Sequence, residues 1–400
     1  MNDDYIRVPY GSTVHGEEEI EAVIEVLKST TQMGSKTQSF EKKVSNLFDK
    51  EYGLMVNSGS SALYLTIESL GIEPGSEVIT PVLTFATTVG CLVKNSLIPC
   101  FVDVSPNTYC INIDLIEEKI SEKTKAILAP NLIGNVCKWD ELRKIADRHN
   151  LILIEDSADC LGSTLNGLST GHYCDHSITS FYGSHIINGA GNGGMLCTSD
   201  LELLEKAKLL RSWGRSSSLF ADSEAIEDRF RVSLEGIEYD AKFVFEEIGY
   251  QLEPSEISAA FALIQLKKLS ENSLKRQKAF KSHTEFLETY KNWISLPEQT
   301  ENSETGWLAY PAVISETAPF SRRDLQIFLE KRNIQTRVVF TGNILRQPGF
   351  KDIDCVGKAD DFTEADKVMR GGMLLACHHG LSIKQLDHIH ESMKSFFDQF

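Results

Sequence analysis

The sequence of 400 residues has no long hydrophobic run, no CxxC cysteine pair and no excess of positive charge. No apolar stretch approaches the roughly 20 residues that a membrane-spanning helix needs. The formal net charge is −17, from 40 Lys and Arg against 57 Asp and Glu, and such a surface repels phosphate backbones. We therefore expect neither a membrane nor a nucleic acid as partner. A small anionic ligand stays open, because a local arginine or a helix N-terminus can hold one.

The nine cysteines are odd in number and irregularly spaced, at positions 91, 100, 110, 137, 160, 174, 197, 355 and 377. This pattern predicts reduced, mostly buried thiols rather than a disulfide framework. The first residues, MNDDYIRVPYGS, are acidic where a signal peptide has basic and then apolar residues. We expect a cytoplasmic protein of enzyme size, with a length that suggests two or three domains.

Short apolar runs alternate with amphipathic segments along the first part of the chain, which is typical of α/β folds. The predicted strands are Gly53–Val56, Glu77–Thr80, Ala126–Ala129, Leu151–Ile154 and Ser177–Phe181. The predicted helices between them are Ser60–Leu70, Ile113–Ile120 and Trp139–His149. Polar residues follow the carboxyl ends of these strands, where open α/β sheets bind their ligands.

The pattern changes near residue 250, where we place the boundary between a large domain (1–250) and a small domain (251–400). Apolar residues from Ile257 onward have helical spacing and predict a long helix running to Arg276. The segments beyond it predict an α+β domain: strand Gly306–Val313, helix Arg322–Arg332, strand Gln335–Phe340 and helix Ile383–Phe397. The N-terminal segment 1–35 is a candidate to pack with this domain. Residues 216–240 are polar and acidic, and form an excursion before the boundary.

Two segments at strand ends carry groups suited to ligand binding. The first, residues 57–62 (NSGSSA), joins a strand to a helix, so its backbone N–H groups and the helix dipole could hold a phosphate. A serine that only caps the helix has the same appearance. The second is Glu155-Asp156, at the end of an apolar strand. A carboxylate there could bind a metal, act as a base, pair with a protonated ring nitrogen, or cap a helix.

A third segment, residues 180–194, contains five glycines and His185. So many glycines indicate a tight backbone path around a ligand. A lone histidine in such a segment is more often structural than catalytic, so the pattern by itself leaves the role of His185 open.

Together and in order, five motifs resemble those of the pyridoxal-phosphate-dependent sugar aminotransferases, the DegT/DnrJ/EryC1/StrS family. They are NSGSSAL, PVLTFATT, IEDSAD, SFYGSH followed by GNGG, and GYQLEPSEISAA. The resemblance implies the type I aspartate aminotransferase fold, with a mixed, mostly parallel sheet in the large domain and a smaller α+β C-terminal domain. It also implies pyridoxal 5'-phosphate (PLP) or pyridoxamine 5'-phosphate (PMP) as cofactor.

The same resemblance assigns roles to individual residues. It implies that Ser60 and Ser180 hold the cofactor phosphate and that Phe85 stacks on the pyridine ring. Asp156 would pair with the ring N–H and keep the ring an electron sink. Three further residues, Gly59, Asp159 and Gln251, are counted among the cofactor-binding residues. Gln251 matches a position that reaches the cofactor of the neighbouring subunit, which implies a homodimer with shared active sites.

The departure from the aminotransferase pattern lies at His185. Aminotransferases of the family carry their cofactor-binding lysine at the sixth position of SFYPxK, whereas this chain reads SFYGSH and has no lysine from Asn166 through Glu205. The same exchange characterises the sugar 3-dehydratases of the family. Asp159, the run 336–348 (TRVVFTGNILRQP) and residues 377–380 (CHHG) are similar to that branch as well.

The resemblance then implies a reaction and its partners. A nucleotide-linked 4-keto-6-deoxy sugar loses its C-3 hydroxyl, with His185 as general base and as acid for the leaving group. L-Glutamate restores PMP, and the product is a 3,6-dideoxy sugar precursor for surface polysaccharide. The alternatives are a nucleotide-sugar aminotransferase and a non-catalytic paralogue that binds a nucleotide sugar.

Cysteine positions separate two kinds of dehydratase. The iron–sulfur kind carries clustered cysteines shortly after a WGR motif. Here Trp213-Gly214-Arg215 is followed by three serines, and no cysteine occurs between Cys197 and Cys355. We therefore expect no iron–sulfur cluster, because that segment has no thiolate to ligate one.

Two His/Cys groups and three cations complete the candidates. His172, Cys174 and His176 alternate and should share one strand face, but no fourth ligand is evident, so we expect no metal there or at Cys377-His378-His379. The candidates for binding substrate phosphates or the glutamate carboxylates are Arg337, Arg346 and Lys242. A surface ion pair is an equally good explanation of each.

Overall fold

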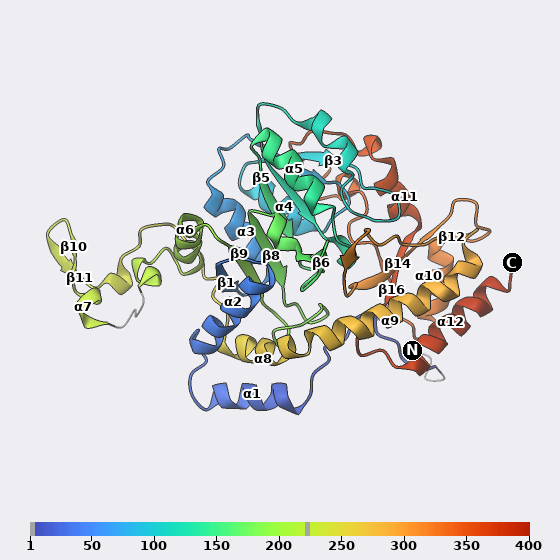
Figure 1. The fold of residues 1–400 in the computed structure, drawn as a ribbon, viewed down its shortest axis with the longest axis horizontal. Coiled ribbons are helices and arrows are strands. Elements are labelled where there is room, and N and C mark those ends of the chain that lie inside the picture. The colour runs from blue at the N-terminus through green and yellow to red at the C-terminus, as the bar shows by residue number, and fades with distance from the viewer. Residues whose placement is uncertain (1–4, 221–224) are drawn as a thin grey trace.

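The computed structural model describes residues 5–220 and 225–400 (Figure 1). In these residues the largest sheet has seven strands in the order β1-β9-β8-β5-β4-β2-β3. Their bounds are β1 Tyr52–Val56, β2 Glu77–Pro81, β3 Ile98–Val102, β4 Thr124–Pro130, β5 Ile152–Asp156, β8 His176–Ser180 and β9 Gly194–Thr198. Only β9 runs against its neighbours, β1 and β8. The carboxyl ends of β1, β5 and β8 therefore share one edge.

Helices cover both faces of this sheet because its strands are apolar on both sides, as in β5, where Leu153 and Ile154 are both fully buried. On one face lie α3 (Gly59–Leu70), α4 (Ala86–Lys94) and α6 (Leu201–Arg211), which share a core with Ile154 and Ile178. On the other face α5 (Trp139–His149) inserts Trp139 against Ile127 and Leu153. Near the edge strand β1, α1 (Glu17–Leu27) and α2 (Ser35–Leu47) pack against α8 (Glu256–Lys267).

The C-terminal part is built on a second, antiparallel sheet. Its order is β12-β14-β16-β15, with bounds Ile294–Ser295, Ala309–Ile314, Gly372–Ala376 and Arg337–Val338. The helices around it are α9 (Leu269–Leu287), α10 (Arg322–Glu330), α11 (Thr363–Gly371) and α12 (Ile383–Phe397). Val8, from the N-terminal segment, is buried in the core of this part and pairs with Ile334. The domain boundary near residue 250 stays a prediction.

An arm projects from the body beside α6 (Figure 1). Its described residues include α7 (Ile226–Arg229) and a hairpin of β10 (Val232–Leu234) and β11 (Ile237–Tyr239). A small separate sheet joins β13 (Ser303–Glu304), β6 (Thr164–Leu165) and β7 (Leu168–Ser169). No helix among the described residues has both the length and the apolar content to cross a membrane.

The five strands predicted from the first part of the sequence are all present, but three other predictions are wrong in detail. Residues 113–120 form two 3₁₀ turns instead of a helix, because only Ile116 of the segment is buried and gives no continuous apolar face. The predicted helix to Arg276 breaks at Lys268, which joins α8 to α9. The predicted strand 335–340 shortens to β15, because Phe340 takes a left-handed backbone with φ of 41°.

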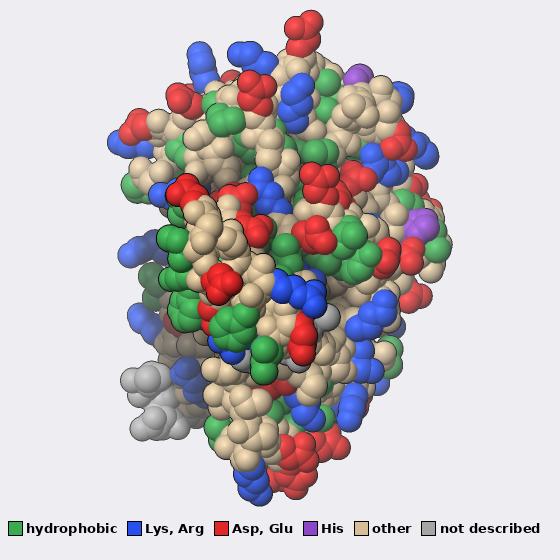
Figure 2. Space-filling model, turned by 90° about the vertical axis from the view of Figure 1, so that its left-hand side faces the viewer, with side chains coloured by type: hydrophobic (Ala, Val, Ile, Leu, Met, Phe, Trp, Pro, Cys, Tyr) green, Lys and Arg blue, Asp and Glu red, His purple; other side chains and the backbone are tan. Residues whose placement is uncertain are grey.

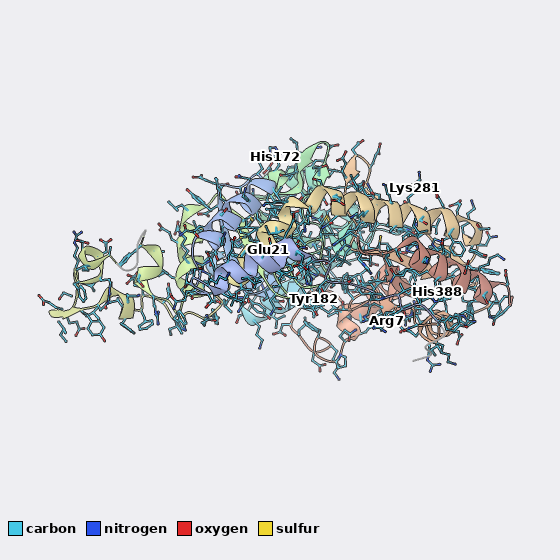
Figure 3. All side chains as sticks on the ribbon, turned by 90° about the horizontal axis from the view of Figure 1, so that it is seen from below. Arg7, Glu21, His172, Tyr182, Lys281 and His388 are labelled. Carbon is cyan, nitrogen blue, oxygen red and sulfur yellow. The ribbon has the colours of Figure 1, made fainter. Side chains whose placement is uncertain are left out.

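The prediction that His172, Cys174 and His176 share a strand face is also wrong. His172 lies in a 3₁₀ turn, η4 (Thr170–Tyr173), and contacts Asp49 at 2.8 Å, while β8 begins only at His176. Figure 3 places His172 at the periphery, well apart from Tyr182. Among the described residues no group of three or more His, Cys, Asp or Glu could hold a metal ion. Eight of the nine cysteines are buried, as predicted.

Candidate active site

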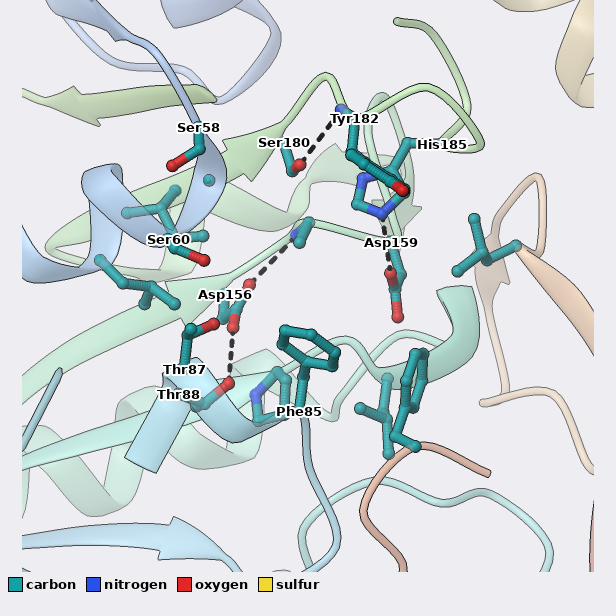
Figure 4. Close-up of a pocket in the computed structure, with 18 of the residues that line it drawn as sticks. Ser58, Ser60, Phe85, Thr87, Thr88, Asp156, Asp159, Ser180, Tyr182 and His185 are labelled. Atoms are coloured by element: carbon teal, nitrogen blue, oxygen red, sulfur yellow. Dashed lines mark hydrogen bonds and ion pairs between the residues drawn. The ribbon is translucent and has the colours of Figure 1, made fainter. Parts of the chain in front are cut away.

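A cavity of about 340 Å³ opens where β1, β5 and β8 end (Figure 4). Four of the five motifs that resemble the family contribute residues to its lining. The motif around Gln251 does not. Of the residues singled out from the sequence, those that line it are Gly59, Ser60, Phe85, Asp156, Asp159, Ser180 and His185. The strand-end segments thus meet at one place, because the parallel strands deliver them to the same edge.

One wall of the cavity is the N-terminus of α3. Ser58 caps this helix by accepting the N–H of Ser61 at 3.1 Å, which fixes the first turn at the end of β1. Gly59 lets this turn approach β8, because a Cβ at position 59 would lie only 2.7 Å from the Cβ of Ser180. Ser60 and Ser180 thereby line the same wall, where the helix dipole favours an anion.

Asp156 ends β5 and projects a buried carboxylate into the cavity. Its Oδ2 accepts the hydroxyl of Thr88 at 3.0 Å, and its Oδ1 accepts the N–H of Ala158 at 3.2 Å. Burial raises the pKa of Asp156 to about 6. A cationic N–H group in the cavity would stabilise this buried carboxylate by pairing with it.

Phe85 is the N-cap residue of α4, lines the cavity and is 52% exposed. It meets Phe340 edge to face, with ring centroids 6.0 Å apart. A half-exposed aromatic face beside a buried carboxylate offers a stacking surface for a flat ring.

His185 lies in the loop between β8 and β9. Its backbone N–H donates to the carbonyl of Tyr182 at 2.9 Å, and its carbonyl accepts Nη2 of Arg276 at 3.2 Å. The imidazole Nε2 lies 3.9 Å from Oδ1 of Asp159, and its buried Nδ1 has no hydrogen-bond partner among the described residues. Burial lowers the pKa of His185 to about 4, so the ring is neutral at neutral pH and can accept a proton.

Asp159 faces His185 from the segment after β5. Its Oδ2 accepts the backbone N–H of Ile133 at 3.0 Å. Burial, and to a lesser extent Asp156, raise the pKa of Asp159 to about 7. Ile133 has a left-handed backbone, φ 62°, which costs a β-branched residue of the order of 1–3 kcal/mol. The surrounding structure therefore has to hold this turn in place.

The residues near the cavity that sequence reasoning missed include Tyr10, Phe340 and Arg276. Tyr10 and Phe340 line it, and Arg276 is fully buried behind His185. The sequence around Arg276, with Lys275 before it and Gln277 and Lys278 after it, gives no hint of burial. The positions of Tyr10 and Phe340 depend on segments far apart in the sequence, which no local pattern reveals.

The structure does not bring the other four candidates into the cavity of this chain. Arg346 is engaged by Asp366, with Nε–Oδ1 at 2.7 Å and Nη2–Oδ2 at 2.5 Å, and by Asp360. Lys242 lies in the projecting arm. Gln251 is exposed and pairs with Ser212 beyond α6. Arg337 is exposed outside the cavity, with its guanidinium carbon 5.4 Å from the ring centroid of Tyr10.

The model of the DegT/DnrJ/EryC1/StrS aminotransferase family matches residues 13–394. The chain belongs to this family. It is 34% identical to lipopolysaccharide biosynthesis protein RfbH of Salmonella typhimurium, over 98% of this chain and 92% of that protein. It is equally identical to dTDP-4-dehydro-2,6-dideoxy-D-glucose 3-dehydratase of Saccharopolyspora spinosa, over 97% of this chain and 86% of that one.

A solved structure of GDP-4-keto-6-deoxymannose-3-dehydratase with a trapped PLP-glutamate geminal diamine has a TM-score of 0.86 at 27% identity, covering 96% of this chain and 100% of that one. The fold is thus the PLP-dependent aminotransferase fold that the motifs implied. The chain is a PLP-dependent sugar-modifying enzyme.

The cavity residues fit this cofactor. Asp156 is a buried carboxylate that a protonated ring nitrogen would pair with, and the half-exposed face of Phe85 lies beside it. The close approach of Gly59 to Ser180, which a Cβ would block, brings the N-terminus of α3 and Ser180 to one cavity wall, where they suit a phosphate group. Each part of the cofactor thus has a matching group in the cavity wall.

Proposed function

We propose that the protein removes the C-3 hydroxyl group from a nucleotide-linked 4-keto-6-deoxy sugar, using PMP that L-glutamate regenerates. The observation that carries this proposal is His185 at the position of the family's lysine, with its imidazole in the cavity wall. No lysine lines the cavity among the described residues. Without an amine there, PLP cannot be attached covalently, but a histidine can still move protons.

The names of similar proteins support this reading. The Saccharopolyspora relative is a 3-dehydratase of a dTDP-linked sugar, and the solved structure is a 3-dehydratase of a GDP-linked sugar that traps glutamate on PLP. Because these two enzymes differ in nucleotide, they support a nucleotide sugar as the substrate class. The Salmonella relative is named for lipopolysaccharide biosynthesis, which fits a 3-deoxy sugar as product.

In this proposal most of the named residues bind and orient the cofactor and the substrate, and His185 moves protons. When bound, PMP would supply an amine for the C-4 keto group and a ring that withdraws electrons. Asp156 would hold the ring N–H, Phe85 would cover the ring face, and Gly59, Ser60 and Ser180 would hold the phosphate. Nε2 of His185, neutral at working pH, would take up the proton released at the cofactor's methylene carbon and give one to the departing hydroxyl, which would leave as water.

Arg337 is our proposed contact for an anionic group of the substrate. Its guanidinium lies near the ring of Tyr10, and Tyr10 lines the cavity, so Arg337 is placed close to the cavity mouth. Arginine suits phosphate geometry because its N–H groups bind two oxygens at once.

The decisive experiment incubates purified protein with PMP and a panel of nucleotide-linked 4-keto-6-deoxy sugars and detects the products by mass spectrometry. The expected result is a loss of one water from at least one sugar, dependent on PMP and renewed by L-glutamate. His185→Asn should reduce this loss by roughly 100-fold or more, because the amide cannot take up a proton. Clean formation of an amino sugar with no water loss would instead make the protein an aminotransferase.

We also propose that the protein is a homodimer whose active sites are shared, with Gln251 facing the partner's cofactor. Large apolar side chains on the arm and the segment after it are exposed, including Ile226, Phe230, Ile237, Phe245 and Ile248, the last at 96%. Figure 2 looks at this end of the molecule and shows hydrophobic side chains gathered there. An exposed apolar surface of this kind is typical of an interface.

The dimer is tested by sedimentation of the cofactor-loaded protein. We expect a mass near twice 44.7 kDa for the wild type and a shift toward monomer for Ile237→Asp combined with Ile248→Asp. Ile383→Asp, which changes an exposed isoleucine of α12 at the far end of the chain, is the matched control and should leave the mass unchanged. A monomeric wild type at micromolar concentration would contradict the proposal.

A further inference from the structure

The proposed function assigns no role to Asp159, whose side chain faces His185. Asp159 points at the imidazole from the side of the β5 end, and both side chains are largely buried, at 11% and 15% exposure (Figure 4). The separation of Asp159 Oδ1 from His185 Nε2 is 3.9 Å. This is close enough for strong electrostatic coupling in a buried site but too long for a hydrogen bond that would occupy the nitrogen.

The two oxygens of Asp159 have different partners. Oδ2 is fixed by the N–H of Ile133 at 3.0 Å, which leaves Oδ1 as the oxygen that faces His185. The turn that presents this N–H is itself held on both sides. The side chain of Asn131 accepts from Trp139 Nε1 and donates to Glu155, and the carbonyl of Ile133 accepts the N–H of Leu308 at 2.7 Å.

The orientation of His185 is fixed from the opposite side. Its N–H and carbonyl are bonded to Tyr182 and Arg276, and its ring meets Tyr182 edge to face at 5.8 Å. Both partners of the Asp159–His185 contact are therefore set by backbone bonds to separate elements. This fixed contact, open to the cavity, places a carboxylate beside the nitrogen that would receive a proton, where its charge can stabilise the cation that forms.

We propose that Asp159 is a positioning residue that must be ionised for His185 to act as base, because its carboxylate stabilises the imidazolium formed at Nε2. The inference rests on the proposed function for its role in turnover. The contact differs from cofactor binding, the role that the family resemblance implied for Asp159. Because Oδ1 stays 3.9 Å away, Nε2 keeps its lone pair free for the proton it receives.

The proton balance of the step is closed within the pair and the substrate. Nε2 takes the proton when the C–H bond of the cofactor's methylene carbon breaks, and Asp159 remains ionised beside the new cation. The imidazolium then gives this proton to the C-3 oxygen as the C–O bond breaks with its electron pair on oxygen, and water leaves. The pair ends with the proton count at which it started, so no outside acid or oxidant is needed.

Other charged and titratable groups act on the same pair. Arg276 acts on both members, Asp156 and Tyr10 face Asp159, and Cys160 lies behind it. Burial and Asp156 favour the protonated carboxyl, whereas Arg276 favours the carboxylate. The carboxyl therefore ionises near neutral pH, and kcat/KM of the wild type should rise with pH through a limb near 7.

Asp159→Asn tests this proposal because the amide oxygen can still accept from Ile133 while the charge is lost. We expect kcat to fall by between about 10- and 1000-fold, KM to change little, and the acid limb to move to lower pH. Asp159→Glu, which restores a carboxylate, should recover part of the rate. Asp103→Asn is the matched control, since Asp103 is buried and accepts backbone N–H groups away from the cavity.

A second measurement separates this inference from the proposed function. The imidazole of His185 is titrated by NMR in the PLP-loaded protein with labelled histidine, and His185→Asn identifies its signal. Asp159 ionises near pH 7, where the imidazole is still neutral, so its charge is detected there through the chemical shifts of the ring. We expect the ring signals of His185 to shift with pH through about 7 in the wild type and in Asp103→Asn, and to lose this shift in Asp159→Asn. A wild type without this shift, or a shift that Asp159→Asn retains, would overturn the pairing, whichever reaction the enzyme catalyses. The shift without any water loss from sugars would leave the pairing intact and refute the dehydratase.

Discussion

Arg276 donates a hydrogen bond from Nη2 to the backbone carbonyl of His185 at 3.2 Å. The same guanidinium donates from Nη1 to the carbonyls of Trp307 and Leu308, at 3.2 and 3.0 Å. One fully buried side chain of α9 therefore ties the loop that carries the proposed base to the two residues that precede β14. Burial lowers the pKa of Arg276 to about 10, which still leaves it charged at neutral pH.

The first prediction concerns this link. Arg276→Met leaves three carbonyls with a lost buried partner, so we expect the free energy of unfolding to fall by about 2–4 kcal/mol. Urea denaturation measures it. Arg322→Met, which removes an exposed bond to the carbonyl of Arg370, should cost less than about 1 kcal/mol. Equal losses of unfolding free energy in the two variants would show that the buried hydrogen bonds of Arg276 contribute no more to stability than the exposed one of Arg322.

The second prediction concerns the approach of α3 to β8. Gly59→Ala places a Cβ 2.7 Å from the Cβ of Ser180, so the N-terminus of α3 must move away from that wall. We expect PLP affinity to fall at least tenfold and stability by about 1–3 kcal/mol. Gly349→Ala, where a Cβ meets no atom within 4 Å, is the control for the added methyl group and should change neither. Titration followed by PLP fluorescence or absorbance reads the affinity.

The positions of Gly59 and Arg276 show why only part of the site could be predicted from the sequence. Gly59, Asp156 and Ser180 lie where strands end, and a strand end is a local feature that an apolar run followed by polar residues reveals. Arg276 and Tyr10 reach the site from elements whose placement depends on the packing of the C-terminal part. Their sequence neighbours carry no sign of that placement.

The surroundings of Arg346 could not be predicted from the sequence for a related reason. A pattern can suggest that Arg346 suits a phosphate, but it does not show that Asp366 lies within 2.7 Å of its guanidinium, 20 residues further along the chain. Helices that continue or break at a single residue were equally hard to predict. Lys268 separates α8 from α9 while its Nζ pairs with the buried Glu19 of α1 at 2.7 Å, a tertiary contact that propensity does not encode.

The third prediction follows from the raised pKa of Asp156, about 6 in the cofactor-free protein. Only the carboxylate form pairs with a ring N–H, so below pH 6 Asp156 must lose its proton when the cofactor binds. Affinity for PMP should therefore fall as pH drops below 6, approaching tenfold per pH unit. The cofactor's phosphate also titrates near pH 6, and Asp156→Asn isolates the carboxyl's share. Calorimetric titrations between pH 5 and 8 should show a weaker pH dependence in the variant, and parallel curves would contradict the assignment.

The fourth prediction concerns a histidine pair far from the cavity. Nδ1 of His283 lies 3.0 Å from Nε2 of His390, and Nε2 of His283 lies 3.0 Å from the carbonyl oxygen of Ala376. A carbonyl only accepts, so Nε2 of His283 must donate and its Nδ1 must accept the N–H of His390. Added protons would break this chain. Burial accordingly lowers the pKa of His283 to about 3.

Between pH 6.5 and 3 the unfolded chain therefore takes up a proton at His283 that the folded protein does not. Stability should fall as pH decreases through this window, by about 1.4 kcal/mol per pH unit for this group alone. Urea denaturation at pH 7, 6 and 5 measures the slope. His283→Asn should lower stability at pH 7 but flatten the slope below pH 6.5, because the variant has no imidazole to protonate on unfolding. His15→Asn, at an exposed position, should leave the slope unchanged. A wild-type slope retained in His283→Asn would mean that other groups control the acid stability of the protein.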